Sequence, residues 1–126
     1  MSRKYFAVAA IFIVVLVLLS ALIQREEEPF SGGVAQIEAG KLLFDKNCAE
    51  CHGSGATGTD VGPPLVHIVY EPSHHADFAF RRAVGQGVRQ HHWRYGDMPA
   101  IDDVSEDQVD AIVAYVRSLQ DAAGIR

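Results

Sequence analysis

Two cysteines and a histidine stand close together in the segment Cys48-Ala49-Glu50-Cys51-His52, a C-x-x-C-H pattern. Two thiols at this spacing can each add across a vinyl group of haem and form thioether bonds. The histidine then lies beneath the ring, where a ring nitrogen can ligate the iron. The pattern is therefore typical of covalent c-type haem attachment. A zinc site would need further ligands, and the chain has no third cysteine. A thioredoxin-like pair belongs in a βαβ unit, which this sequence does not predict.

The ligand on the opposite face of the iron decides what such a haem can do. Met98 is the only methionine after the initiator, and it lies in the loop segment Gly96-Asp97-Met98-Pro99 instead of on a helical stripe. A thioether is a soft, neutral ligand, and His/Met ligation raises the haem potential. We therefore predict His52 and Met98 as the axial ligands. His91 and His92 are the alternatives, which would lower the potential, and an open sixth position would favour ligand binding or catalysis.

The elements that position these residues have a helical pattern. Over residues 34–47 the apolar spacing predicts a helix, with Ile37, Gly40, Phe44 and then Cys48 on one stripe. A glycine inside a helix costs about 1 kcal/mol relative to alanine. We therefore expect another helix to cross at Gly40 at close range, with Phe44 packed beside the crossing.

A second, shorter helix is predicted over residues 77–88, between two polar loops. Gly85 or Gly87 is expected to end it. We expect its buried side to be formed by Phe78, Phe80 and Val84.

The last helix has the clearest signals. Ser105-x-x-Gln108 is a capping box, followed by acidic residues in the first turn. Gly124 is expected to end this helix. Its buried stripe is predicted to contain Val109, Ile112, Val113, Val116 and Leu119, with Tyr115 beside it. No segment alternates as a strand would, so the sequence predicts an all-α domain of three or four helices. Its core is thin for its length, and a buried porphyrin would supply the missing apolar contacts.

The loop between the first two helices contains Gly62-Pro63-Pro64-Leu65. A backbone carbonyl in this segment can accept the Nδ1–H of His52 and so direct Nε2 toward the iron. An ordinary rigid turn is the alternative interpretation of the two prolines.

Near the N-terminus, residues 5–23 form an apolar run interrupted only by Ser20. As a helix these positions span about 28 Å, close to the hydrocarbon thickness of a bilayer. The run is longer than the apolar part of most signal peptides and lacks a good cleavage site. We therefore predict a retained membrane anchor over residues 5–23 in preference to a cleaved signal. Residues 1–4 precede it, residues 24–33 form a linker, and residues 34–126 form the haem domain.

Charge predicts the orientation of this anchor. Arg3 and Lys4 precede the run and residues 26–28 are glutamates, so the haem domain should face the outside of the cytoplasmic membrane. Residues 26–126 contain 8 Lys and Arg against 16 Asp and Glu. Nucleic acid is therefore an unsuitable partner. A redox partner with a basic docking patch suits this surface better.

These residues together resemble a class I cytochrome c, over roughly residues 34–120. Gly40, Phe44 and the motif Cys48, Cys51 and His52 stand at the spacing of that family's first helix and attachment site. The resemblance implies a compact helical fold around one covalently bound haem c, with an exposed thioether edge and one-electron transfer.

Other segments resemble the same family. Met98-Pro99 is similar to its axial-ligand loop, and the helix with Tyr115 is similar to the one that crosses the first helix. Pro64, twelve residues after His52, matches the proline whose carbonyl steadies the histidine. The N-terminal span is like that of anchored bacterial cytochromes of respiratory chains.

The predicted function is therefore a membrane-tethered monohaem electron carrier, not an enzyme. Its partners would be a quinol-oxidising complex, a copper protein or a terminal oxidase. The alternatives are a haem subunit of a larger oxidase or reductase, or a haem or metal sensor. The sensor hypothesis depends on paired histidines that the family does not require, namely His74, His75, His91 and His92; His67 is a further histidine of this kind. Imidazoles are common ligands of transition metals, although exposed loop histidines would account for these residues equally well.

Overall fold

The computed structural model describes residues 32–126 together with Ile13, Val15 and Leu16. In this part of the chain no helix is both long enough and apolar enough to cross a membrane. The predicted anchor over residues 5–23 lies outside the described residues, apart from those three positions. Gly33–Arg126 forms one compact unit, and the fold is that of this unit.

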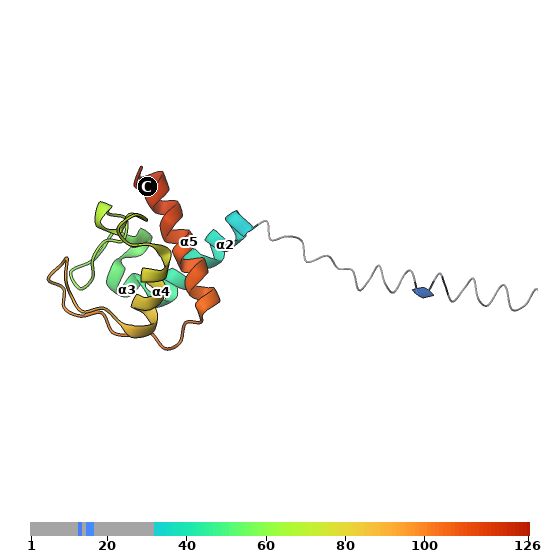
Figure 1. Ribbon diagram of the computed structural model, residues 1–126, viewed down its shortest axis with the longest axis horizontal. Coiled ribbons are helices and arrows are strands. Elements are labelled where there is room, and N and C mark those ends of the chain that lie inside the picture. The colour runs from blue at the N-terminus through green and yellow to red at the C-terminus, as the bar shows by residue number, and fades with distance from the viewer. Residues whose placement is uncertain (1–12, 14, 17–31) are drawn as a thin grey trace, which may run out of the picture. The chain divides into compact units, whose positions relative to one another are not determined.

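Helices make up the regular structure of this unit (Figure 1). In chain order they are α2 (Gly32–Asn47), α3 (Ala49–His52), the 3₁₀ turns η1 (Ser54–Ala56) and η2 (Ile68–Tyr70), α4 (Asp77–Gln86) and α5 (Glu106–Ala122). Between residues 32 and 126 the only extended pairing is an antiparallel bridge between Val88 and Met98. The predicted all-α class is therefore confirmed. Helix α2 begins at Gly32, two residues before the predicted start, and so includes the end of the expected linker.

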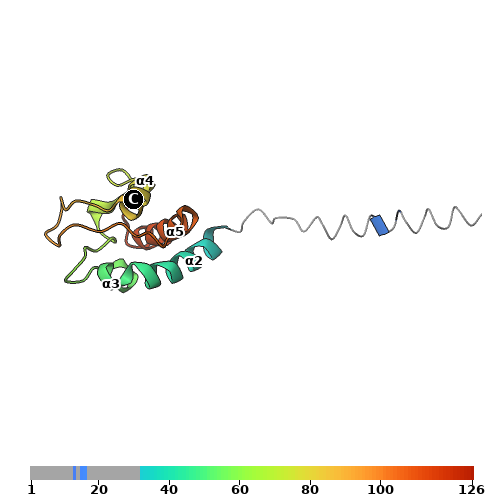
Figure 2. The same ribbon diagram turned by 90° about the horizontal axis from the view of Figure 1, so that it is seen from below.

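Helices α2 and α5 cross at Gly40, as its position in the stripe predicted. A Cβ atom built on Gly40 would overlap the backbone carbonyl of Ala111 and would lie 3.0 Å from Cβ of Tyr115. One turn further along α2, the side chain of Phe44 is 0% exposed, and its ring centroid lies 5.6 Å from that of Tyr115. Figure 2 shows the two helices side by side from a second direction. Glycine is required here because only a residue without a side chain lets the two backbones approach this closely.

Helix α5 supplies most of the core. The predicted capping box is present: Gln108 N–H donates to Ser105 Oγ at 3.4 Å, and Ser105 N–H donates to Gln108 Oε1 at 3.0 Å. The predicted stripe is also confirmed, with Leu119 partly buried at its end. The buried residues of α5 are Val109, Ala111, Ile112, Val113, Tyr115, Val116 and Gln120.

Helix α4 packs against α5 and ends at Gln86. Gly87 follows with φ +72°, so the stop is Gly87 and not Gly85. Phe80 is partly buried against the core, but Phe78 is 62% exposed, so the prediction of a buried Phe78 was wrong. The reason is helical geometry, since residues two apart lie on different faces whereas Phe80 and Val84 are four apart and share one.

Candidate functional site

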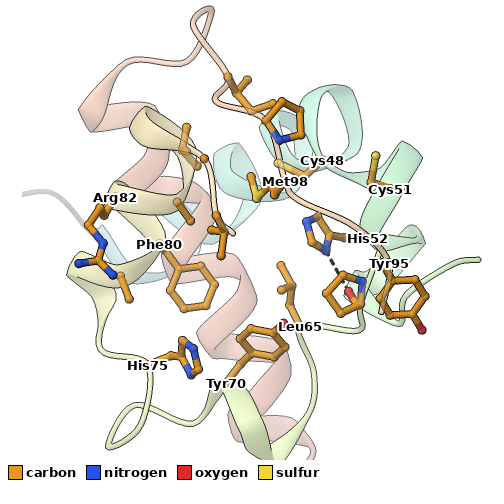
Figure 3. A pocket seen from close by; sticks show the side chains of 18 of the residues that line it. Cys48, Cys51, His52, Leu65, Tyr70, His75, Phe80, Arg82, Tyr95 and Met98 are labelled. Atoms are coloured by element: carbon orange, nitrogen blue, oxygen red, sulfur yellow. Dashed lines mark hydrogen bonds between the residues drawn. The ribbon is translucent and has the colours of Figure 1, made fainter. Parts of the chain in front are cut away.

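The C-x-x-C-H segment lies at the junction of α2 and α3. Cys48 N–H donates to the carbonyl of Phe44 at 2.8 Å, and the N–H groups of Cys51 and His52 donate to the carbonyl of Cys48 at 3.2 and 2.9 Å. This single turn brings both thiols and the imidazole to the wall of one cavity (Figure 3). Both cysteines are free thiols. Burial, and to a smaller extent Cys51, raises the pKa of Cys48 to about 11, so this thiol is protonated at neutral pH.

The orientation of His52 suits it for metal ligation. Its Nδ1 lies 2.9 Å from the backbone carbonyl of Pro63. A carbonyl can only accept, so Nδ1 carries the proton and the lone pair of Nε2 is free. Burial lowers the pKa of His52, and the hydrogen bond to Pro63 opposes this effect only in part. The neutral imidazole, which is the form that binds iron, is therefore favoured.

The acceptor for His52 is one residue away from the predicted one. Pro64 was expected to offer its carbonyl, but the bond is to Pro63, and Pro64 does not line the cavity. The Pro64 ring instead packs on Gly58, where an added Cβ would lie 2.7 Å from the Pro64 nitrogen. The next residue, Leu65, donates its N–H to the carbonyl of Ala56 at 2.8 Å. These contacts direct the backbone of Pro64 toward the Ala56–Gly58 turn and leave the Pro63 carbonyl facing His52.

The cavity has a volume of about 560 Å³, within the range of 300–1,000 Å³ that is common for cofactor sites. Cys48, Cys51 and His52 lie on its wall, and much of the remaining lining is apolar. The apolar residues include Phe44, Leu65, Phe80, Val84, Val88, Ile101, Val104 and Ile112. A flat apolar macrocycle with two vinyl groups and a central metal fits this set of donors and this lining.

Met98 lines the same cavity and is partly buried. Its N–H and carbonyl each pair with Val88 at 2.9 Å, so its backbone position is determined by two hydrogen bonds. Gly87 contributes to this position, because a Cβ there would lie 2.5 Å from the Met98 carbonyl oxygen. In Figure 3 the thioether of Met98 points into the space that Cys48 and His52 also face. The structure thus brings together the residues that were predicted from two distant segments.

Polar and aromatic side chains surround the opening of the cavity. Trp93 and Tyr95 line it, but Arg94, which lies between them in the chain, does not. Two arginines that the sequence did not single out, Arg82 and Arg89, line it instead. Guanidinium groups bind carboxylates well, so these arginines suit the acidic edge of a haem.

Five histidines lie outside the C-x-x-C-H segment, and three of them line the cavity. His75, His91 and His92 line the cavity. The two considered as alternative iron ligands, His91 and His92, are exposed, whereas Met98 is partly buried. His67 has a separate role, because its Nδ1 accepts the N–H of Val69 at 3.2 Å and its ring packs edge-on against Trp93.

Two polar residues of α5 position the far wall of the cavity, and the sequence analysis did not identify them. Gln120 is 1% exposed, and its Nε2 donates to the carbonyls of Leu65 at 2.8 Å and Tyr70 at 3.1 Å. Arg117 donates to the Tyr70 carbonyl at 2.7 Å and to Gln120 Oε1 at 2.6 Å. A signal was present in the sequence, since Gln120 follows Val116 by four residues and so continues the buried stripe with a polar side chain.

Comparison with known proteins agrees with this geometry. A sequence model of the cytochrome c family, described as "Cytochrome c", matches residues 37–120. The chain is 25% identical in sequence to cytochrome CL from the marine methylotrophic bacterium Methylophaga aminisulfidivorans, whose crystal structure it matches with a TM-score of 0.51. The match covers 79% of this chain and 63% of that one.

Two curated relatives are much longer than the matched region. Subunit 2 of cytochrome c oxidase from Alkalihalophilus pseudofirmus is 30% identical over 89 residues, which are 64% of this chain and 25% of that protein. The quinohemoprotein alcohol dehydrogenase ADH IIB from Pseudomonas putida is 29% identical over 99 residues, which are 78% of this chain and 13% of that protein. This chain therefore spans a quarter or less of the length of these relatives.

Proposed function

The chain belongs to the cytochrome c family, and on that basis we propose that it is a membrane-tethered monohaem electron carrier. Family membership and the Cys48/Cys51 pair mean that it binds one covalently attached haem c. It is an electron-transfer protein, and bound haem supplies a one-electron Fe(III)/Fe(II) couple. We also propose the finer assignments, which concern the axial ligands, the membrane tether and the redox partners.

The proposed axial ligands are His52 and Met98. The observation that carries this proposal is that both line one apolar cavity, each in a determined orientation: His52 through the Pro63 carbonyl and Met98 through its paired backbone with Val88. Cys48 and Cys51 would form the thioether bonds. If the protein occupies both axial positions of the iron, no coordination position remains where a substrate could bind the metal. We therefore propose a carrier and not an enzyme.

A redox titration of the full-length, haem-loaded protein in detergent, with and without CO, tests this ligation. The parent should have a positive potential and should not bind CO when reduced. Met98→Ala should bind CO and have a lower potential, because an open position replaces the thioether. His91→Ala and His92→Ala are matched controls in the same loop and should behave like the parent. A potential unaffected by Met98→Ala, or CO binding by the parent, would contradict the proposal.

The tether and its orientation are proposed from the sequence. Their support is the apolar run over residues 5–23, with Arg3 and Lys4 before it and three glutamates after it. On this proposal the haem domain faces the periplasmic side of a bacterial cytoplasmic membrane, and electrons pass between a quinol-oxidising complex, a copper protein or a terminal oxidase. The protein should stay in the membrane fraction after an alkaline wash, and externally added protease should digest the haem domain in spheroplasts. Release by the wash would argue against a tether.

A second function, as a haem subunit of a larger oxidase or reductase, is favoured by the two longer relatives. One is named as a subunit of an oxidase and the other as a quinohemoprotein dehydrogenase, and the match covers only part of each. Purification in mild detergent separates the two proposals. A stoichiometric partner that remains bound through gel filtration would support the subunit, and a monodisperse single chain would support the free carrier.

A further inference from the structure

Four of the six histidines gather at the rim of the cavity, away from the C-x-x-C-H segment. We call His74, His75, His91 and His92 the histidine cluster. Two of its members precede α4, and the other two lie in the loop between α4 and Met98. Ring centroids lie 4.7 Å apart for His74 and His75, 5.2 Å for His75 and His92, and 4.3 Å for His91 and His92. The fold thus brings together two histidine pairs that are separated by more than a dozen residues.

The nitrogen atoms of the histidine cluster are spaced as metal ligands require. Nε2 of His74 lies 3.4 Å from Nε2 of His92. One potential ligand nitrogen from each of His74, His75 and His92 lies within 4.8 Å of the other two. Two imidazole nitrogens bound to one tetrahedral ion, each about 2.0–2.1 Å from it, are about 3.3 Å apart. The first pair already has this separation, and the nitrogen of His75, within 4.8 Å of both, would have to move closer to bind the same ion.

Hydrogen bonds to the backbone orient two rings of the histidine cluster. Nδ1 of His75 lies 2.6 Å from the carbonyl of Val69, and Nδ1 of His91 lies 2.9 Å from the carbonyl of Arg89. In each case Nδ1 must carry the proton, which leaves Nε2 as a free donor of a lone pair. A backbone carbonyl behind a ligating histidine is the usual support for a metal-bound imidazole.

The charges near the histidine cluster are compatible with a cation. One fixed positive charge beside the cluster is Arg117, which donates to the backbone carbonyl of His75. Arg117 is itself paired with Asp77, at 2.9 Å between Nε and Oδ1. The pair is close to neutral, so it does not exclude a divalent ion from the adjacent imidazoles.

We propose that His74, His75 and His92 bind one divalent transition-metal ion of the class that prefers imidazole, Zn²⁺ or Cu²⁺, with His91 beside the site. Such an ion would cross-link the segment that precedes α4 to the loop that leads to Met98. It would therefore clamp the loop that positions Met98, independently of which redox partner the protein serves. One direct hydrogen bond between this loop and the segment that precedes α4 is that of Trp93 Nε1–H to Tyr70 Oη, at 3.1 Å. A metal ion bound by the histidine cluster would add a further connection between them.

Zinc titration of the full-length, haem-loaded protein tests the site. Calorimetry should find one Zn²⁺ per chain, and the melting temperature should rise with Zn²⁺ because the ion binds the folded state more tightly than the unfolded one. The double variant His74→Ala/His92→Ala should lose at least about tenfold in affinity and most of the thermal shift. His67→Asn is the matched control, because it removes a histidine that belongs to neither the cluster nor the haem motif and leaves an acceptor for Val69 N–H. It should bind Zn²⁺ like the parent.

Cu²⁺ supplies an independent signature. One equivalent added to the parent should give an electron paramagnetic resonance spectrum with nitrogen hyperfine splitting from imidazole, absent in the double variant. Unchanged affinity in the double variant, or a copper signal from oxygen ligands only, would place the ion elsewhere, for example on acidic residues, and would overturn the proposal. If the visible haem spectrum of the double variant differs from that of the parent, the variant is misfolded, and the single variants His74→Gln and His92→Gln take its place. A loss of Zn²⁺ affinity in these variants would support the site, and unchanged affinity would overturn it.

Discussion

The helix crossing and the cavity rim are built in opposite ways. At the crossing, α2 and α5 touch through Gly40, and Phe44 and Val116 are completely buried. At the rim, loops surround an apolar space of about 560 Å³ and are positioned mainly by hydrogen bonds from side chains such as Gln120 and Arg117. The crossing is filled by the chain's own atoms, whereas the apolar wall of the cavity is complete only with a cofactor.

This difference shows where the protein obtains its stability. Packed helices gain hydrophobic and dispersion energy from contacts that are present as soon as the chain folds. The loops lack such contacts around the cavity, so haem is expected to be part of their core. Each of the following predictions tests one side of this comparison.

Loss of haem should have the largest effect. The double variant Cys48→Ala/Cys51→Ala cannot form the thioether bonds. Without haem the apolar lining of this open space stays in contact with water, which at about 25 cal/mol per Å² costs on the order of 5 kcal/mol, a large part of the stability of a small domain. We expect this variant to lose cooperative thermal unfolding, as measured by circular dichroism. A sharp transition near that of the parent would show that the rim folds without haem.

Gly40→Ala should have the next largest effect, because the added Cβ overlaps the backbone of Ala111, which cannot move aside. We expect a loss of about 3 kcal/mol in the free energy of unfolding, measured by denaturant titration. Gly33→Ala is the matched control on the same helix, since nothing lies within 4 Å of its added Cβ. This change should be neutral or stabilise the protein by up to about 1 kcal/mol. Equal effects of the two variants would contradict the close crossing.

Gln120→Met keeps a long side chain but removes the hydrogen bonds to the carbonyls of Leu65 and Tyr70. The Leu65 carbonyl would then lack its donor, and the Tyr70 carbonyl would keep only that of Arg117. We therefore expect a loss of about 2 kcal/mol. Amide hydrogen exchange should show the loosening in residues 65–75 and not at the helix crossing. As a control, Ser118→Ala removes only a bond to the Tyr115 carbonyl within α5 and should change stability by less than about 0.5 kcal/mol. Uniform loosening of the whole domain would contradict a local role of Gln120.

Ser105→Ala should have the smallest effect, because it removes the hydroxyl that caps α5 at an exposed position. A loss of about 1 kcal/mol is expected, seen as a small decrease in the denaturant midpoint. Ser105→Asp retains a capping oxygen and should restore most of this loss. A loss with Ser105→Asp as large as that with Ser105→Ala would show that the cap does not act through this hydrogen bond.

Much of the fold could be predicted because its signals are local in the chain. The capping box of α5 and its buried stripe are recognised from residues three or four positions apart. The same spacing places Gly40 on the buried stripe of α2, which is why a close helix crossing was expected there. Phe78 was the exception, because it was assigned to a buried face without regard to the angle between residues two apart. Met98 could be singled out only because it is the one methionine after the initiator, and its backbone pairing with Val88 was not visible in the sequence.

By itself, the sequence determined the haem chemistry and the helices, since thioether attachment requires two thiols and a histidine at one short spacing, and helices depend on nearby residues. Only the tertiary structure decided which proline carbonyl supports His52, which α5 side chains position the loops, and that the histidine pairs meet. These contacts join segments up to 55 residues apart, as Gln120 and Leu65 are. They depend on the conformation of loops, which is determined by the packing of residues distant in the chain. Local sequence patterns therefore do not predict these contacts.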